Sequence, residues 1–222
     1  MFFVLSLPLV TIAEFRAATF EADITSPVGH ACMGGGVADA KRIVDPLFAK
    51  GFVLLGAGEP IVVAALDWCQ CNNDSYDRWR IGLAEAAGTR AERVMLATVH
   101  PHDAPICDLT AQRLLDQHGL TNWNCDAVFH DQAAQRTAAA LASSLKSSRR
   151  VTHLGTGQAK VVQLASDRRV VRPNGKITGN VGAAAAIFSA RPKAKLIPGS
   201  RRSASGMVTN RCCLGVPTPF TP

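Results

Sequence analysis

Two histidines and an aspartate lie within four positions of each other, in the stretch ATVHPHDAP of residues 97–105. Side chains of an extended segment alternate between its two sides, so His100 and His102 are expected to project to the same side. Imidazole is the commonest protein ligand of metal ions, and a catalytic zinc takes three protein ligands and one water. Asp103 could orient an imidazole or act on a metal-bound water. The spacing is compatible with zinc-assisted hydrolysis, and it fits equally well two loop histidines hydrogen-bonded to nearby backbone.

The elements before this stretch place it at the edge of a sheet. A β-rich run, Arg93–Val99, leads into it, so His100 stands at the carboxyl end of a predicted strand. Open α/β sheets bind ligands at the carboxyl ends of their strands. A second apolar run, Ile61–Leu66, ends at Asp67, which would share the cleft if the two strands are parallel. Asp67 fits equally an exposed loop carboxylate or a cap for the following turn. His30, beside a glycine-rich loop, could line the same cleft.

Periodicity and end signals predict an α/β fold, with a mixed β-sheet flanked by helices. Strands are predicted at Ala18–Ile24, Lys50–Leu55, Ile61–Leu66, Arg93–Val99, Val151–Val162 and Arg169–Thr178; the second and third form a hairpin, and Pro173, Asn174 and Gly175 bend the last. Helices are predicted from an N-cap at Asp74 to Gly88, over Leu109–His118 closed by Gly119, and from Asp126 to Arg149.

The longest of these helices has the clearest pattern. Its apolar face is predicted to hold Phe129, Ala133, Ala140, Leu141 and Leu145, and Arg149 and Arg150 stand near its end, where the helix dipole favours cations. We place His118 and His130 on helix surfaces and His153 in a strand, each in a structural role.

The chain divides into three parts by composition. Residues 1–17 contain an apolar segment of signal-peptide length without a preceding Lys or Arg, so they predict either export, to the periplasm or the exterior, or an N-terminal strand of a cytoplasmic protein. Residues 18–178 hold the predicted α/β domain. Residues 179–222 are basic and of low complexity, and we expect a disordered tail such as a shifted reading frame would produce.

The charge does not predict a nucleic-acid partner. The formal net charge is +7, but residues 191–222 carry six of the 24 basic residues and no acid, so the rest of the chain is nearly neutral. A phosphate-binding face also needs aromatic or hydrogen-bonding company, and this tail has only Phe220.

The seven cysteines contain no CxxC pair, so a structural zinc site of the usual spacing is not expected. Because seven is odd, at least one cysteine is unpaired within the chain. We predict that Cys32, Cys107 and Cys125 are buried free thiols.

Four segments form an ordered set: ADITSPVGH (22–30), DPLFAKGFVLL (45–55), PIVVAALD (60–67) and RVMLATVHPHDAP (93–105). Together they resemble the N-terminal domain of the neutral/alkaline, non-lysosomal ceramidases and their bacterial relatives. That family has a DIT-x-P-x-G opening, an apolar strand pair ending in Asp, and a strand that runs into an HTHSGP-like motif. The resemblance covers roughly residues 18–178.

The resemblance implies a secreted or membrane-associated zinc amidase that hydrolyses ceramide or a related lipid amide. It maps His100 to a zinc ligand and His102 to a position beside the metal in the substrate pocket. The metal would activate a water and polarise the amide carbonyl while a neighbouring base takes the proton.

The sequence departs from the family in two ways. Pro101, Asp103 and Ala104 replace the family's Thr, Ser and Gly, which indicates a divergent branch. The family's other zinc ligands are a downstream His, Glu and Tyr, yet here no His follows His153, no acid follows Asp167 and the only Tyr is Tyr76. We therefore expect a truncated chain with an incomplete zinc site. The alternative is a non-catalytic fragment or binding module with a vestigial half metal site.

Overall fold

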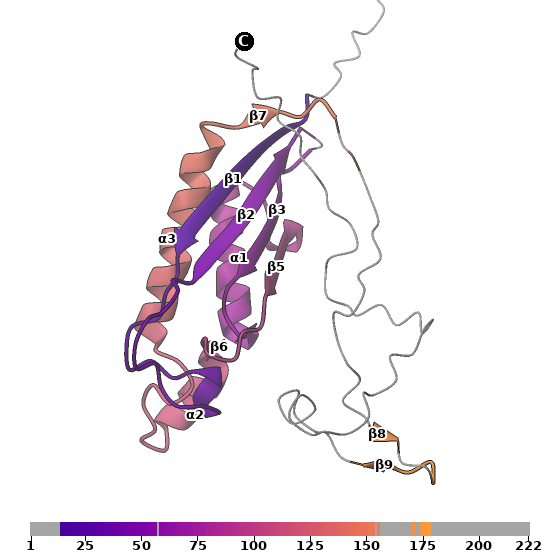
Figure 1. The fold of residues 1–222 in the computed structure, drawn as a ribbon. Helices are drawn as coiled ribbons and strands as arrows, with labels where there is room; N and C mark the ends of the chain where they lie inside the picture. The colour runs from indigo at the N-terminus through magenta and orange to yellow at the C-terminus, as the bar shows by residue number, and fades with distance from the viewer. Residues whose placement is uncertain (1–13, 57, 154, 156–169, 172–173, 179–222) are drawn as a thin grey trace, which may run out of the picture. The chain divides into compact units, whose positions relative to one another are not determined.

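The computed structural model describes residues 14–56, 58–153, 155, 170–171 and 174–178. Figure 1 shows the course of the chain. The chain divides into two compact units, which meet in sequence between Thr152 and His153. The first unit holds a sheet, its helices and every predicted site residue. The second holds one short hairpin among its described residues.

The first unit is built on a five-stranded sheet in the order β5-β3-β2-β1-β7. Its strands are β1 (Arg16–Asp23), β2 (Phe48–Leu55), β3 (Ile61–Leu66), β5 (Val94–Thr98) and β7 (Arg149–Arg150). All neighbours pair antiparallel except β3 and β5, which are parallel. The predicted mixed sheet and hairpin are thus confirmed. A smaller sheet pairs β4 (Gln70–Asn72) with β6 (Ile106–Asp108) in parallel.

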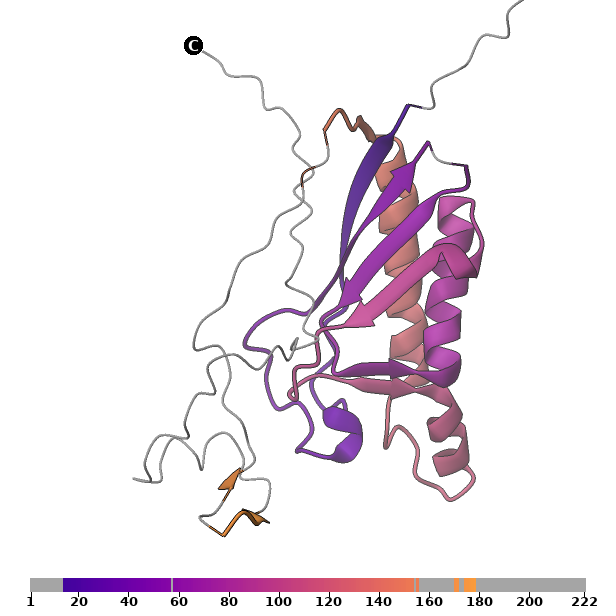
Figure 2. The same ribbon diagram turned by 90° about the vertical axis from the view of Figure 1, so that its right-hand side faces the viewer.

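Three helices accompany the sheet: α1 (Asn73–Ala87), α2 (Leu109–Asp116) and α3 (Ala127–Leu145). Figure 2 shows α1 and α3 side by side on one face of the five-stranded sheet. Several helices begin or end where the sequence predicts. Asp108 and Asp126 cap α2 and α3 by accepting hydrogen bonds from backbone N–H groups of the first turn. Gly88 ends α1 in the left-handed region, with φ 67°.

Two predicted helix ends were wrong. Asp74 is not the N-cap of α1, because the helix already begins at Asn73. The Asp74 carboxylate instead pairs with Arg113 of α2. Arg149 and Arg150 do not stand at the end of α3; they form β7 and pair with the first residues of β1. In the sheet, the backbone of Arg149 and Arg150 pairs with that of β1, which it could not do if α3 continued through these residues.

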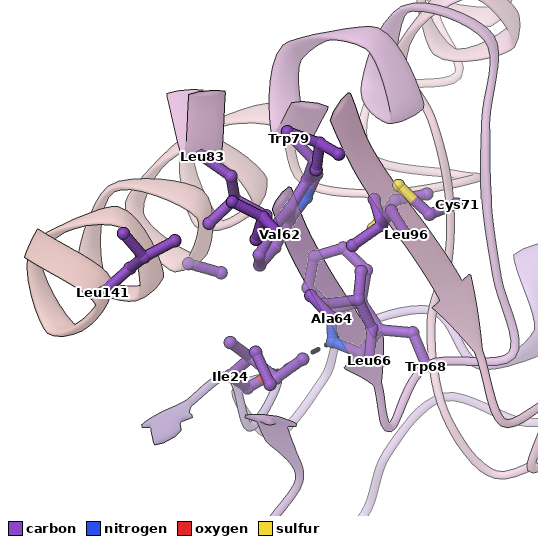
Figure 3. Close-up of a cluster of buried hydrophobic side chains, with 14 of the residues drawn as sticks. Ile24, Val62, Ala64, Leu66, Trp68, Cys71, Trp79, Leu83, Leu96 and Leu141 are labelled. Atoms are coloured by element: carbon purple, nitrogen blue, oxygen red, sulfur yellow. Dashed lines mark hydrogen bonds between the residues drawn. The ribbon is translucent and has the colours of Figure 1, made fainter. Parts of the chain in front are cut away.

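Two tryptophans form the centre of the core, between the sheet and the helices (Figure 3). Trp68 and Trp79 are fully buried and meet edge to face, with ring centroids 5.4 Å apart. The Trp68 indole Nε1 donates to the carbonyl of Ile24 at 3.1 Å. This bond ties the second residue after β3 to the first residue after β1.

His130 is fully buried, so its predicted place on a helix surface was wrong. It belongs to a buried stripe of α3 with Ala133, Thr137 and Leu141. The spacing of three to four residues is that of a helix face turned to the core. Its ring lies near both tryptophans, with centroids 6.1 Å from Trp68 and 6.3 Å from Trp79.

The remaining predictions have mixed outcomes. The second unit contains β8 (Val170–Val171) and β9 (Ile177–Thr178), an antiparallel pair around the predicted Pro-Asn-Gly turn. Cys32, Cys107 and Cys125 are buried free thiols, as predicted. Most of the predicted strand over 151–162 and most of the signal segment lie outside the described residues. The whole tail of 179–222 lies outside them.

Candidate functional site

The carboxyl ends of β3 and β5 lie side by side, because these strands are parallel and Leu66 is in register with Thr98. The pairing continues past both strands. The N–H of Val99 donates to the carbonyl of Leu66 at 3.0 Å, and the N–H of His100 donates to the carbonyl of Trp68 at 3.1 Å. These bonds hold the start of the HxH stretch against the chain that follows β3.

His100 has an oriented ring on an unusual backbone. Its φ of 66° lies in the left-handed region, which non-glycine residues seldom adopt outside turns and functional sites. Ring atom Nδ1 lies 2.8 Å from the carbonyl oxygen of Cys69. Only a protonated Nδ1 can donate to a carbonyl, so in the neutral ring the lone pair is on Nε2. Zinc-binding histidines often have this arrangement, with one nitrogen donating to a carbonyl and the other facing the metal.

A second donor holds the same carbonyl. The Thr98 hydroxyl donates to the Cys69 oxygen at 3.2 Å, so strand β5 fixes the acceptor as well as the histidine that follows it. The Cys69 thiol lies 3.5 Å from Nδ1 of His100 and is buried. Burial raises the pKa of this thiol, which therefore stays protonated.

His102 lies directly beside His100, but not for the predicted reason, because His100 is left-handed and His102 lies in a turn and not in an extended segment. The two ring centroids are 5.2 Å apart at an interplanar angle of 86°, and both residues are exposed. The edge-to-face contact places a second titratable ring within reach of a ligand held on His100.

A hollow of about 360 Å³ opens beside His100. Sequence reasoning did not single out its polar lining, which comes from Gln70 and Asn72 of β4 and from Tyr76 of α1. The alternation of Gln70 and Asn72 around a cysteine was the available signal, since residues two apart on a strand share a face. These groups could hydrogen-bond a polar substrate, and Leu96 and Ala97 add an apolar wall.

Asp103 lies in a different hollow from His100. It lines a space of about 570 Å³ together with Thr25, Ser26 and the loop of residues 38–45. It also lies close enough to Cys32 to raise the pKa of that thiol, after the larger effect of burial. Its predicted catalytic role stays a prediction.

Asp67 is near the site, but its carboxylate faces away from β5. Oδ2 accepts a hydrogen bond from the N–H of Phe48 at 2.9 Å, and the Asp67 N–H donates to the Phe48 carbonyl at 2.9 Å. Phe48 begins β2, which lies on the other side of β3 from β5. Asp67 thus closes the open end of the β2–β3 pair.

Both ring nitrogens of His30 are engaged in the fold. Nδ1 lies 2.8 Å from the carbonyl of Ala31, and Nε2 accepts from the N–H of Asp126 at 3.3 Å. Burial lowers the pKa of this imidazole, which keeps it neutral and able to accept. His30 therefore supports the start of α3, with its ring against Phe129 at 5.1 Å.

The described residues fit one part of a zinc site. With Nδ1 protonated, the neutral His100 ring has an Nε2 that could bind a metal, and His102 lies beside it. Among residues 14–178, so far as the structure describes them, no group of three His, Cys, Asp or Glu side chains is placed to hold a metal ion. No helix in the described part of the chain is long and apolar enough to cross a bilayer.

Comparison with known proteins gives a likeness in fold. A crystal structure of neutral ceramidase from Pseudomonas aeruginosa superposes with a TM-score of 0.52 at 18% identity, over 67% of this chain and 24% of that one. A second structure, a ceramidase complexed with C2, aligns at 18% identity over the same shares with a TM-score of 0.49. The chain thus spans about a quarter of the length of these structures. No family model matches the sequence, and no curated protein matches it. The chain thus contains a domain with a ceramidase-like fold.

Proposed function

We propose, from this ceramidase-like fold, that the chain contributes to a zinc-dependent hydrolase of lipid amides, such as an N-acyl sphingoid base. The observation that carries the proposal is the setting of His100. Its left-handed backbone and its bond to the Cys69 carbonyl fix the ring beside a second histidine and a hollow, and they leave the lone pair of the neutral ring on Nε2. The remaining zinc ligands would come from outside the described residues.

Each side chain has a proposed part in the reaction. His100 would hold the metal, and a bound zinc would supply an activated water and polarise the amide carbonyl. His102 would exchange a proton with the reacting groups, because its ring lies beside His100 and is open to solvent. Gln70, Asn72 and Tyr76 would hydrogen-bond the polar head of the substrate, and Leu96 would contact its apolar part.

The substrate class also suggests association with a membrane surface. The loop between β1 and β2 exposes Ile43 and Val44 directly after Lys41 and Arg42. Apolar side chains next to cations suit the boundary between acyl chains and anionic headgroups. We propose that this loop reaches the bilayer from which a lipid amide would be taken, which also agrees with export of the protein.

Zinc titration of the purified chain tests the metal assignment. His100→Ala should abolish zinc binding measured by calorimetry, whereas His118→Ala should keep it, because His118 is an equally exposed histidine beyond the end of α2. Equal zinc binding by both variants would remove His100 from the site.

Amide hydrolysis tests the reaction itself. Because the metal site is incomplete in this chain, we expect the zinc-loaded wild type to release a fluorescent fatty acid from a short-chain ceramide only slowly. His102→Ala should lower this rate by about 10²–10⁴-fold, as expected for loss of a proton-transfer group. Zinc binding should persist in that variant. If zinc binds at His100 but no ceramide is cleaved by the wild type, the alternative is favoured: a non-catalytic binding module with half a metal site.

A further inference from the structure

A further hollow, of about 330 Å³, shares no lining residue with the hollow beside His100. It lies between the glycine-rich loop that follows His30 and the loop that precedes the N-cap of α3. The residues that these two loops contribute to its lining are Gly35, Val37, Asp39, Thr121, Asn122 and Trp123. The proposed hydrolase chemistry uses none of them.

A buried glutamine holds the loop before α3. Gln112 of α2 is 3% exposed. Its side-chain N–H donates to the carbonyl of Leu120 at 3.0 Å, and its side-chain oxygen accepts from the N–H of Asn124 at 2.8 Å. Residues 121–123, which line the hollow, are the three residues between these two bonds. Their backbone is therefore held from both ends.

The glycine-rich loop is held by backbone bonds of its own. The N–H of Gly29 donates to the carbonyl of Ala40 at 2.7 Å, and the N–H of Ala40 donates to the carbonyl of His30 at 3.0 Å. These bonds fix the chain at Asp39 beside the chain at Gly29, which also lines the hollow. A binding site made of loops is precise when the loops are held in this way.

Trp123 gives the hollow an exposed aromatic surface. It is 56% exposed, whereas the other two tryptophans of the chain, Trp68 and Trp79, are fully buried. The indole rests against Gly35, because a Cβ at that glycine would lie 3.1 Å from Nε1 and 3.5 Å from Cδ1 of Trp123. Glycine thus allows the ring to contact the loop closely. The ring is supported at this edge and remains largely open to solvent.

The polar side chains around the ring are available to a ligand. Asp39, Thr121 and Asn122 are exposed, and their side chains form no hydrogen bond within the described part of the chain. The Asp39 carboxylate can accept hydrogen bonds, and the Asn122 amide can both donate and accept them. No Lys or Arg among the described residues lines the hollow, so it does not suit a phosphate or another anion.

We infer that this hollow binds a neutral pyranose, either as a free saccharide or as the sugar head group of a lipid. The C–H groups of a pyranose pack on the face of an aromatic ring, and its hydroxyl groups donate and accept hydrogen bonds. One exposed indole among separate polar groups fits this ligand. A quaternary ammonium fits less well, because it is bound in a cage of several aromatic rings.

The size of the hollow agrees with this ligand. Its volume lies at the small end of the range of about 300–1,000 Å³ for small-molecule sites, which suits one or two sugar rings. The inference goes beyond the proposed hydrolase and does not depend on it.

Tryptophan fluorescence of the full chain tests the inference. The probes are methyl β-glucopyranoside, methyl β-galactopyranoside and lactose. We expect at least one of them to change the fluorescence saturably, with a Kd of about 1 mM for so small a ligand, and to protect Trp123 from quenching by acrylamide. If none of the three binds, or if only choline binds, the inference is wrong.

Three variants locate the site by calorimetry. Trp123→Ala should abolish sugar binding, and Asp39→Asn should weaken it about tenfold, because a hydrogen bond to a charged acceptor is lost. Leu114→Ala is the control, since Leu114 of α2 is an apolar side chain that is 58% exposed and lies outside the hollow. It should bind as the wild type does. Unchanged binding by Trp123→Ala would overturn the inference.

Two further measurements separate related questions. Zinc binding at His100 should be the same in all three variants, so a failure of the sugar site is distinguishable from a failure of the proposed hydrolase. Retention of the protein on vesicles that contain galactosylceramide, above that on phosphatidylcholine alone, assigns the ligand to a lipid head group if Trp123→Ala removes the difference. Equal retention, with binding of a soluble probe, assigns it to a free saccharide.

Discussion

Arg78 of α1 and Asp131 of α3 join the two helices through hydrogen bonds of 3.2 and 3.0 Å from one guanidinium nitrogen to both carboxylate oxygens. The same carboxylate lies 2.9 Å from Nδ1 of His130. The Asp131 carboxylate thus connects an arginine at the surface of the helices with a fully buried imidazole. This link makes the packing of α1 on α3 sensitive to the charge on His130.

Stability should decrease in mildly acid solution. Burial lowers the pKa of both His30 and His130 below the ordinary value of 6.5, although Asp131 partly opposes the effect at His130. The unfolded chain then binds more protons than the folded one, so stability present above pH 6.5 is lost as the pH falls through the folded values. The loss is about 1.4 kcal/mol for each unit of pKa depression. Urea unfolding at pH 7.5, 6.0 and 5.0 measures it.

Two histidine variants separate this effect from other titrations. His130→Phe should flatten the acid slope, because the ring is kept while the titrating group is removed. His118→Gln should leave the slope unchanged, since His118 is exposed. An acid slope that is the same in wild type and His130→Phe would show that His130 does not contribute.

The two core tryptophans should respond differently to the same substitution. Trp68 donates to the Ile24 carbonyl, whereas Nε1 of Trp79 has no hydrogen-bond partner in the described part of the structure. Trp68→Phe and Trp79→Phe remove the same volume, but only the first leaves a buried carbonyl without its donor. We expect Trp68→Phe to cost about 1–3 kcal/mol more free energy of unfolding. Equal losses in denaturant titrations would contradict this.

Gly51 of β2 should tolerate no side chain. A Cβ there would overlap the Phe20 ring and lie 2.5 Å from the carbonyl oxygen of Val63, which is backbone and cannot move aside. Gly51→Ala should therefore destabilise the protein by about 1–3 kcal/mol or prevent folding. Gly82→Ala is the control, because a Cβ at this helical position meets no atom within 4 Å. It should raise the melting temperature through a gain of about 0.5–1 kcal/mol in helix propensity.

Asp67 should matter for stability and not for zinc. Asp67→Ala removes the acceptor for the Phe48 N–H and should cost about 1–2 kcal/mol in denaturant titrations. Zinc affinity should stay that of the wild type, because the carboxylate is directed to β2. Loss of zinc binding in a folded Asp67→Ala protein would place this carboxylate in the metal site after all.

The sequence was informative where structure depends on neighbouring residues. Asp126 and Gly88 are end signals that act within one turn of a helix, and both were predicted as helix ends. Asp108 acts in the same way, but only the start of α2 at Leu109 was predicted. The parallel β3–β5 pair follows from the helix between these strands. The direction of the Asp67 carboxylate could not be predicted, because it depends on which strand pairs with β3 on its other side.

Burial of polar residues was the main failure of prediction. His130 was placed at the surface because imidazole is polar, but its ring packs near Trp68 and Trp79, which are distant in sequence. The polar lining of the hollow beside His100 was missed for a related reason. Gln70 and Tyr76 come from a short strand and a helix whose position beside β5 is set by tertiary packing.

A main-chain atom, the carbonyl oxygen of Cys69, orients the His100 ring. An acceptor that belongs to a peptide group is present whatever amino acid occupies position 69, so the bond that orients the His100 ring does not depend on the Cys69 side chain. A substitution at Cys69 should therefore leave this hydrogen-bond acceptor in place. The direction of the imidazole would then be kept when the side chain at position 69 is changed.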